Sequence, residues 1–209
     1  MPVQINYKNK LSKKLTDIIL FVDENYNISG LKKHISKQEF SYVSDLIITK
    51  DPKKNIVSFD INSKKKIVLV SFKKTIKNSE AVNLGAKFYD IHKDYKNRTY
   101  NLISDTLFFK SNNLVGYFLH GLKLKSYKFD KYKTKKNTNN FSIVVTGKNK
   151  PMVSDQIKFK AIEDGTFYTR DLVSEPGNVL HPDEYAKRLN SLKKHGLKIN
   201  IYDEKKLKK

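Results

Sequence analysis

Residues 17–25 read Asp-Ile-Ile-Leu-Phe-Val-Asp-Glu-Asn, and this stretch decides the fold. Its five consecutive apolar residues, from Ile18 to Val22, have the length and composition of a buried β-strand. The polar residues 23–25 that follow end the strand. The sequence on both sides of this strand is therefore expected to supply the elements that bury it.

Further strands are predicted from short alternating or continuous apolar runs. They span residues 2–7, 56–61, 67–70, 100–103 and 141–145. The short gap between 56–61 and 67–70 predicts a hairpin. Leu197, Ile199 and Ile201 alternate with polar residues and predict a last strand.

Apolar residues at three- to four-residue spacing predict helices between these strands. The ranges are 79–95, 112–127, 151–174 and 182–195, while residues 38–48 fit either a small helix or a turn. In the first helix, Val82, Ala86 and either Tyr89 or Phe88 are expected on the apolar face. In the third, an apolar stripe is expected to begin with Val153 and Ile157. Pro176-Gly177 and Gly196 are expected to end the last two helices.

Alternating strands and helices indicate an α/β layer fold. We expect one domain over residues 1–150, a connector helix over 151–175, and a further segment over 176–209. This last segment has one helix and one strand but no sheet of its own. A lone strand cannot bury its faces, so we expect the truncated start of a second α/β domain.

The chain is strongly basic, with 42 Lys and Arg against 21 Asp and Glu, a net charge of +21. Residues 1–150 carry 30 basic and 12 acidic residues, a net +18. Only three of the basic residues are Arg, the usual residue for bidentate phosphate and base recognition. The charge therefore favours a solvated lysine surface, but nucleic-acid binding stays open.

One basic stretch is interleaved with the aromatic residues Tyr127, Phe129 and Tyr132, a pattern that can bind single-stranded nucleic acid. The alternative is that the rings pack while the lysine stems lie over them. The candidate nucleic-acid contacts are Lys123, Lys125, Lys128, Lys131, Lys133, Lys135 and Lys136.

No catalytic or metal-binding constellation is found in the sequence. It has no Cys, its five His are scattered, and it lacks the His-Glu-x-x-His and Gly-x-Ser-x-Gly motifs. Gly147-Lys148 lacks the other residues of a phosphate loop and favours a turn at a strand end. With no apolar leader and no long apolar run, we expect a soluble cytoplasmic protein without a membrane span.

Two segments carry a family resemblance. Residues 170–182, Arg-Asp-Leu-Val-Ser-Glu-Pro-Gly-Asn-Val-Leu-His-Pro, resemble the segment that opens the catalytic domain of leucyl aminopeptidases, the cytosol aminopeptidase family. The likeness continues through 185–189 and 197–205. Residues 121–134 are similar to the family's helix ending in Tyr-x-Phe-Asp-x-Tyr. Ser174 and His181 depart from the family, which usually has Asn and Thr there.

The resemblance implies a macro-domain-like mixed sheet between helices, a connector helix and the first elements of the peptidase domain. It implies that the intact protein is a homohexameric metallopeptidase that removes N-terminal residues from peptides with two divalent metal ions, Mn or Zn. The family's metal ligands and catalytic residues match no position here. The 209 residues alone are therefore expected to be inactive and to bind no metal.

Two other interpretations stay open. The basic residues 1–150 could form a DNA- or RNA-binding module without enzymatic activity. Macro-like folds include some that bind ADP-ribose, although this chain has no Gly-rich nucleotide loop.

Overall fold

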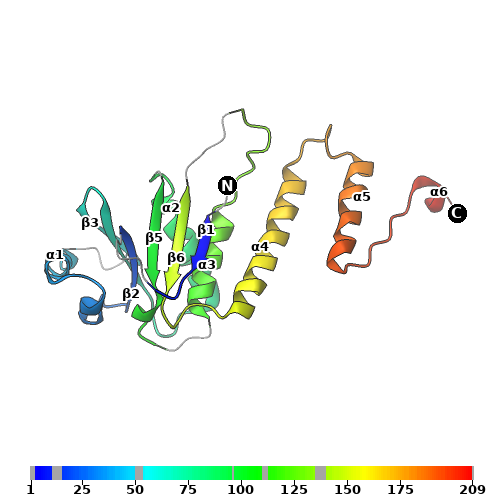
Figure 1. Ribbon diagram of the computed structural model, residues 1–209. Coiled ribbons are helices and arrows are strands. Elements are labelled where there is room, and N and C mark those ends of the chain that lie inside the picture. Colours follow the sequence, from blue (N-terminus) through cyan, green and yellow to red (C-terminus); the bar gives the residue numbers. More distant parts are fainter. Residues whose placement is uncertain are drawn as a thin grey trace. The chain divides into compact units, whose positions relative to one another are not determined.

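The computed structural model describes residues 3–10, 16–49, 54–95, 97–109, 113–134 and 140–208 (Figure 1). Pro2 and Asn112, the first residues of two predicted elements, lie outside these ranges. The strands are β1 (Gln4–Tyr7), β2 (Asp17–Val22), β3 (Ile56–Asn62), β4 (Lys65–Ser71), β5 (Arg98–Ile103) and β6 (Phe141–Thr146). The helices are η1 (Ser29–Lys33), α1 (Lys37–Ile47), α2 (Asn78–His92), η2 (Ser104–Thr106), α3 (Leu114–Lys125), α4 (Val153–Ser174), α5 (Pro182–Asn190), η3 (Ser191–His195) and α6 (Glu204–Leu207).

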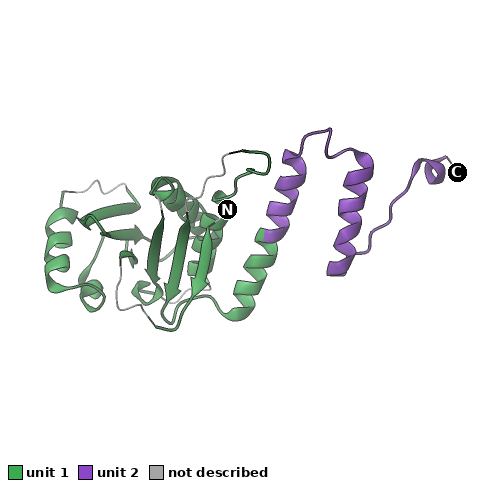
Figure 2. Ribbon diagram, turned by 45° about the horizontal axis from the view of Figure 1, so that its top comes forward, with its two compact units in different colours: residues 1–163 green, residues 164–209 purple. Residues whose placement is uncertain are grey.

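The chain forms two compact units, unit 1 over residues 1–163 and unit 2 over residues 164–209 (Figure 2). Helix α4 begins in unit 1 and ends in unit 2. The domain boundaries expected from the sequence, at 150 and 175, stay a prediction.

Unit 1 is built on one six-stranded mixed sheet in the order β1-β6-β5-β2-β4-β3. The first five strands of that order run parallel, and β3 pairs antiparallel with β4 as the predicted hairpin. The expected α/β fold with a mixed sheet flanked by helices is confirmed.

The apolar run of β2 explains the layered arrangement. Ile19 and Phe21 face a core cluster that also contains side chains of α2 and α3. Ile18, Leu20 and Val22 face a second cluster on the other side of the sheet, closed by η1 and α1. Because β2 has neighbours on both edges and helices on both faces, a strand apolar throughout is what this position requires.

The buried face of α2 differs in part from the expected one. Tyr89 and Phe88 are buried as expected, but Val82 and Ala86 are only partly buried, and Ala81 and Gly85 are buried instead. Close packing of α2 on α3 is the physical reason. A Cβ atom on Gly85 would lie 1.8 Å from the carbonyl oxygen of Phe118, and one on Gly121 would lie 1.9 Å from that of Val82. The two glycines let the helix backbones touch, so they define the contact face.

Residues 38–48, left open between helix and turn, form the helix α1. Its N-cap Ser36 and Glu39 form a reciprocal capping box, which satisfies two backbone N–H groups at the helix start.

The prediction of an apolar, buried stripe along α4 is wrong for the first turns of this helix. Val153 and Ile157 are 69% and 64% exposed, and the adjoining Met152 is 75% exposed. Phe159 of α4 instead packs on α3, with its ring centroid 5.2 Å from that of Tyr117. We call Met152, Val153 and Ile157 the α4 strip. It leaves three apolar side chains facing water.

Within unit 2, the predicted helix 182–195 is found as α5 continued by η3, and Gly196 ends it with a left-handed φ of 83°. The predicted strand at residues 197–201 is wrong, because these residues form no strand. The part of unit 2 that the structure describes offers no strand for them to pair with. Arg188 holds unit 2 together, since its guanidinium donates to Glu175 and Glu184, both at 2.9 Å.

Among the described residues, none of the helices combines the length and the hydropathy that crossing a membrane requires.

Candidate functional site

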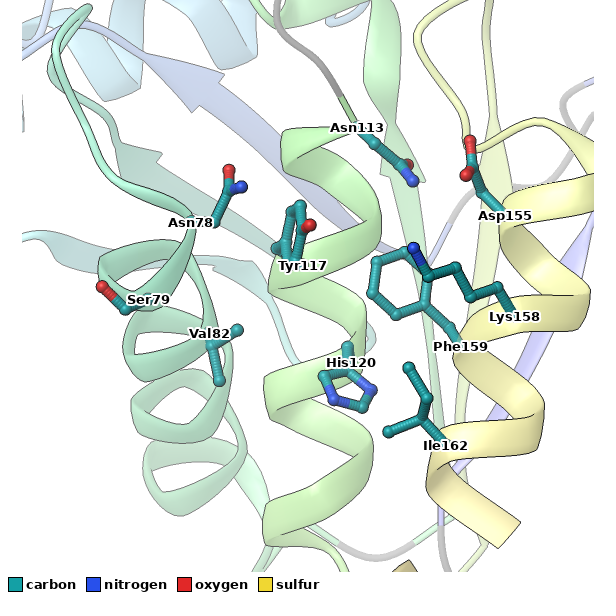
Figure 3. Close-up of a pocket in the computed structure, with 10 residues that line it drawn as sticks. All are labelled: Asn78, Ser79, Val82, Asn113, Tyr117, His120, Asp155, Lys158, Phe159 and Ile162. Atoms are coloured by element: carbon teal, nitrogen blue, oxygen red, sulfur yellow. The ribbon is translucent and has the colours of Figure 1, made fainter. Parts of the chain in front are cut away.

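A groove between α2, α3 and the first half of α4 is one candidate binding site in unit 1. Its volume is about 320 Å³. We call it the helical groove, and Figure 3 shows the side chains that line it. They are Asn78, Ser79 and Val82 from α2, Asn113, Tyr117 and His120 from the start and body of α3, and Asp155, Lys158, Phe159 and Ile162 from α4.

A hydrogen bond between two side chains joins α4 to α3 at this groove. His120 Nδ1 lies 2.9 Å from a carboxylate oxygen of Glu163, and both side chains are largely buried. The Phe159 ring lies tilted against the His120 ring, with centroids 5.1 Å apart. Burial raises the pKa of Tyr7 to about 12, and the negative charge of Glu163 adds to that shift. The groove therefore adjoins a buried carboxylate whose hydrogen-bond partner is His120.

The N-cap residue of α3 has an unusual conformation. Asn113 is its N-cap with a left-handed φ of 66°, and its side chain makes no capping hydrogen bond. Its Oδ1 atom is buried and has no partner in the part of the chain that the structure describes. Gly116 allows this placement, because a Cβ there would lie 2.5 Å from Asn113 Oδ1 and 2.5 Å from a Phe159 ring carbon. A buried acceptor left unpaired costs about 1–3 kcal/mol.

The second candidate site, the strand-end cleft, lies beyond the carboxyl ends of β2 and β5 and has a volume of about 910 Å³. The chain leaves β2 toward α1 on one face of the sheet and leaves β5 toward α3 on the other. In open α/β sheets this divergence creates a crevice where ligands bind.

Charged residues line the strand-end cleft, but two of its carboxylates are already engaged. Asp23 accepts hydrogen bonds from the backbone N–H groups of Asn25 and Asn27. Asp105 accepts one from the N–H of Lys148, at 2.6 Å. The side chains of Lys33, Lys74 and Lys148 and the half-exposed ring of Phe108 also line the cleft. The lysines and the ring could contact an anionic, aromatic ligand.

The turn after β6 confirms the interpretation of Gly147-Lys148. Gly147 has a left-handed φ of 105°, directly after the last residue of β6. Because the Lys148 N–H is taken by Asp105, it is not presented to a phosphate.

The basic stretch is spread over the surface rather than collected into a site. Lys123 donates to the Val3 carbonyl, Lys125 pairs with Asp90 at 3.0 Å, and Lys133 pairs with Asp130. Lys131 stacks over Tyr132, while Lys128 is exposed. Lys135 and Lys136 lie outside the described residues. Four of the five lysines that the structure describes thus contact groups of the chain itself.

The described residues contain no group of three or more His, Asp or Glu side chains placed to hold a metal ion. They do not fit the two-metal centre that the family resemblance implies for the intact enzyme. No chemical step through a metal is therefore assigned to this chain.

Sequence reasoning missed the helical groove. Its residues come from three segments about 35–45 positions apart and share no motif. The one local signal is the pair Asn113 and Gly116. Asn readily adopts a left-handed backbone, and Gly in the first turn of a helix suggests close approach of another group.

Three comparisons with known proteins bear on the whole chain. No family model matches it. It is 38% identical over 96 residues to a probable cytosol aminopeptidase of Brucella melitensis, covering 43% of this chain and 20% of that protein. The chain thus spans about a fifth of the length of the curated relatives that it matches.

Two solved structures of aminopeptidases share the fold of this chain. A mutant of tomato leucine aminopeptidase superposes with a TM-score of 0.73 and 16% identity, over 99% of this chain and 45% of that one. The cytosol aminopeptidase of Coxiella burnetii superposes with a TM-score of 0.59 and 15% identity, over 90% of this chain and 37% of that one. In sequence and in fold, the chain resembles the N-terminal portion of the cytosol, or leucine, aminopeptidases.

Proposed function

We propose that these 209 residues are the N-terminal, non-catalytic portion of a leucine-aminopeptidase-type peptide hydrolase. One observation carries this proposal: almost the whole chain superposes on less than half of the tomato enzyme. The identity of 38% to a probable cytosol aminopeptidase supports it. In the intact protein, unit 1 would support the association of subunits. The peptide bond would be hydrolysed in the C-terminal, catalytic domain.

The intact protein would hydrolyse N-terminal residues from peptides with two divalent metal ions, Mn or Zn. Such ions polarise the scissile carbonyl and generate the attacking hydroxide. We further propose a homohexamer and a cytoplasmic location. The word cytosol in the names of the relatives supports the location.

The test is an assay of the purified 209-residue chain with leucine p-nitroanilide in Mn²⁺ or Zn²⁺. We expect no hydrolysis above the no-protein rate. A full-length leucine aminopeptidase assayed in parallel shows that the conditions support catalysis. Hydrolysis by the 209 residues that disappears with a chelator would contradict the proposal. The reading frame downstream of Lys209 gives a second test, since the proposal requires a Lys- and Asp-bearing glycine-rich segment in the intact protein.

The nucleic-acid alternative finds no support in the names of the relatives or solved structures. Its remaining test is binding to single-stranded DNA or RNA at about 50 mM salt, where phosphate contacts are strong. An absence of binding there removes it.

A second candidate function, binding of ADP-ribose, is favoured by the position of the strand-end cleft at the divergence of β2 and β5. Lys74 and Lys148 would pair with the pyrophosphate and Phe108 would stack on the adenine. Calorimetry with ADP-ribose tests it, with the Lys74→Glu and Lys148→Glu variants expected to weaken binding. A null titration of the unaltered chain would exclude it.

A further inference from the structure

Ser58 and His92 form a hydrogen-bonded pair at one edge of the sheet, outside both candidate binding sites. The Ser58 Oγ atom lies 3.0 Å from Nε2 of His92. Ser58 is in β3, the last strand in the sheet order, and His92 is the last residue of α2. Side chains two positions apart on a strand share a face, and Ile56 of β3 packs in the cluster with α2. The fold therefore holds a hydroxyl against an imidazole.

The other nitrogen of the ring fixes the direction of this hydrogen bond. His92 Nδ1 lies 2.8 Å from the Phe88 carbonyl oxygen, which can only accept, so Nδ1 carries a proton. His92 is 1% exposed and burial lowers its pKa, so the ring is neutral near pH 7 and Nε2 has a lone pair. Ser58 Oγ therefore donates to Nε2. A serine, a histidine and an acceptor that orients the histidine make up the arrangement that activates a serine nucleophile.

The groups packed around the His92 ring keep it a base. Burial lowers its pKa most, and the hydrogen bond to the backbone of its own helix opposes that shift. The Lys66 ammonium in β4 lowers the pKa of His92 further, while the Asp17 carboxylate in β2 raises it. The rings of Tyr100 in β5 and of Tyr95 lie with centroids 5.4 and 6.1 Å from the imidazole. This packing holds Nε2 toward the serine hydroxyl.

The backbone of β3 adds a hydrogen-bond donor beside that hydroxyl. The Asn55 carbonyl accepts the Ser71 N–H at 2.8 Å, which makes these two residues a hydrogen-bonded pair of the hairpin. Such pairs alternate along an antiparallel ladder, so Ser58 and the opposite Val68 share no backbone hydrogen bond. The Ser58 N–H therefore points away from β4, toward the outer edge of the sheet. There it can donate to the oxyanion that forms when a hydroxyl attacks a carbonyl.

We propose that Ser58 is an activated nucleophile that accepts an acyl group from a small ester, with His92 as its general base. Ser58 Oγ forms a bond to the acyl carbon, and the C–O bond of the ester breaks. His92 Nε2 takes the Oγ proton and passes it to the departing alkoxide, so the products are acyl-Ser58 and an alcohol. Because Ser58 is only partly buried, a small acyl donor can reach it. This step uses no metal ion and is independent of the proposed function.

The experiment incubates the 209-residue chain with p-nitrophenyl acetate and maps the acetylated residues by mass spectrometry of its peptides. Mild hydroxylamine cleaves esters and spares amides, so it separates acetylated serine from acetylated lysine. The matched control is Ser142 in β6, which is also partly buried but has its Oγ 2.8 Å from the Thr99 hydroxyl instead of an imidazole. A general base accelerates such steps about 10²- to 10⁴-fold, so Ser58 should be acetylated at least about tenfold faster than Ser142. A smaller ratio would overturn the proposal.

The pH dependence distinguishes a general base from a structural hydrogen bond. The neutral ring is the base, and its pKa lies below the ordinary value of about 6.5. The rate at Ser58 should therefore stay level from about pH 8 to about pH 6.5 and fall in more acid solution. At Ser142 the rate should follow the hydroxide concentration throughout. A rate at Ser58 that follows hydroxide in the same way would also overturn the proposal.

Two histidine variants test the base directly. His92→Gln should lower the rate at Ser58 to that at Ser142. His34→Gln is the control, because burial also lowers the pKa of His34 but its ring lines the strand-end cleft, and it should leave the rate unchanged. The NMR spectrum verifies the fold of each variant, and if His92→Gln does not fold, the pH profile of the unaltered chain decides. Unchanged acetylation of Ser58 in folded His92→Gln, or its loss on adding a chelator, would contradict the proposal.

Discussion

The guanidinium of Arg98 donates to both carboxylate oxygens of Asp17, with distances of 2.9 and 3.0 Å from one nitrogen. Asp17 begins β2 and is only 2% exposed, while Arg98 begins β5, the neighbouring strand. The same carboxylate accepts the backbone N–H of Lys66 in β4 at 2.8 Å. One buried carboxylate thus links the beginnings of three parallel strands.

Arg98→Met should destabilise unit 1 strongly. It leaves the buried Asp17 carboxylate without its cation, and breaking a buried pair from one side costs about 3–5 kcal/mol. Because Arg98 is partly exposed, we expect a loss somewhat below this range, about 2–3 kcal/mol in the free energy of unfolding by urea. Lys93→Met breaks the half-exposed pair with Asp90 and serves as the control, with a loss below about 1 kcal/mol. Equal losses in the two variants would contradict this account.

Alanine at the α2–α3 crossing should also destabilise the protein. In Gly85→Ala and Gly121→Ala the new methyl group meets a backbone carbonyl at under 2 Å, and a backbone atom cannot rotate away. We expect losses of about 1–3 kcal/mol or more for each, measured by thermal unfolding.

The matched control for these two variants is Gly165→Ala in α4, where nothing lies within 4 Å of the added Cβ. There, alanine should stabilise the helix by up to about 1 kcal/mol. A stabilising Gly85→Ala would show that the helices are not in backbone contact.

Stability should fall as the pH drops below about 6.5, the ordinary pKa of His. Burial lowers the pKa of His92, although its hydrogen bond to the Phe88 carbonyl opposes the shift. The folded state therefore holds this ring neutral, while the unfolded state takes up a proton. Because the unfolded state binds more protons between the two pKa values, acid favours unfolding in that range.

The measurement is the urea midpoint at several pH values between 7.5 and 5.5. In His92→Gln the midpoint should vary less with pH than in the unaltered chain. His34→Gln is measured beside it, since burial also lowers the pKa of His34 and it contributes to the same slope. An unchanged pH dependence in His92→Gln would show that His92 does not cause it.

Arg188→Gln should loosen unit 2. Arg188 donates to Glu175 and Glu184, and its carbonyl accepts the Tyr168 hydroxyl at 3.0 Å, so one residue joins α5 to the end of α4. Without the guanidinium, amide hydrogen exchange in α5 should accelerate by about tenfold, equivalent to about 1.4 kcal/mol. Lys187→Gln is the control and should leave the exchange rates nearly unchanged. Equal rates in the two variants would show that α5 is held by other contacts.

The sequence predicted those elements whose burial is decided by local pattern. The strand β2 was found at its observed boundaries because residues 18–22 are apolar without interruption and Asp23 follows. The hairpin of β3 and β4 followed from the short gap between two strand patterns. In such segments the local pattern of apolar and polar side chains is enough to predict which residues are buried.

The errors arose where a neighbour decides the structure. In α2, Gly85 has no side chain to register as apolar, yet it lies at the centre of the buried face because α3 approaches its backbone. At residues 197–201 the alternation fits a strand, but pairing needs a partner that no local pattern supplies. The helical groove was missed for the same reason, since Asn113 and Ile162 meet only through the packing of α3 and α4.

The α4 strip has a consequence for how copies of the molecule meet in solution. Met152, Val153 and Ile157 would reduce their contact with water if two copies came together, and the net charge of +21 opposes that approach. The range of this repulsion is the Debye length, about 10 Å at 0.1 M salt and about 3 Å at 1 M. Concentrated salt, often added to keep basic proteins apart from nucleic acid, should therefore promote self-association of this one, while dilute buffer keeps it dispersed.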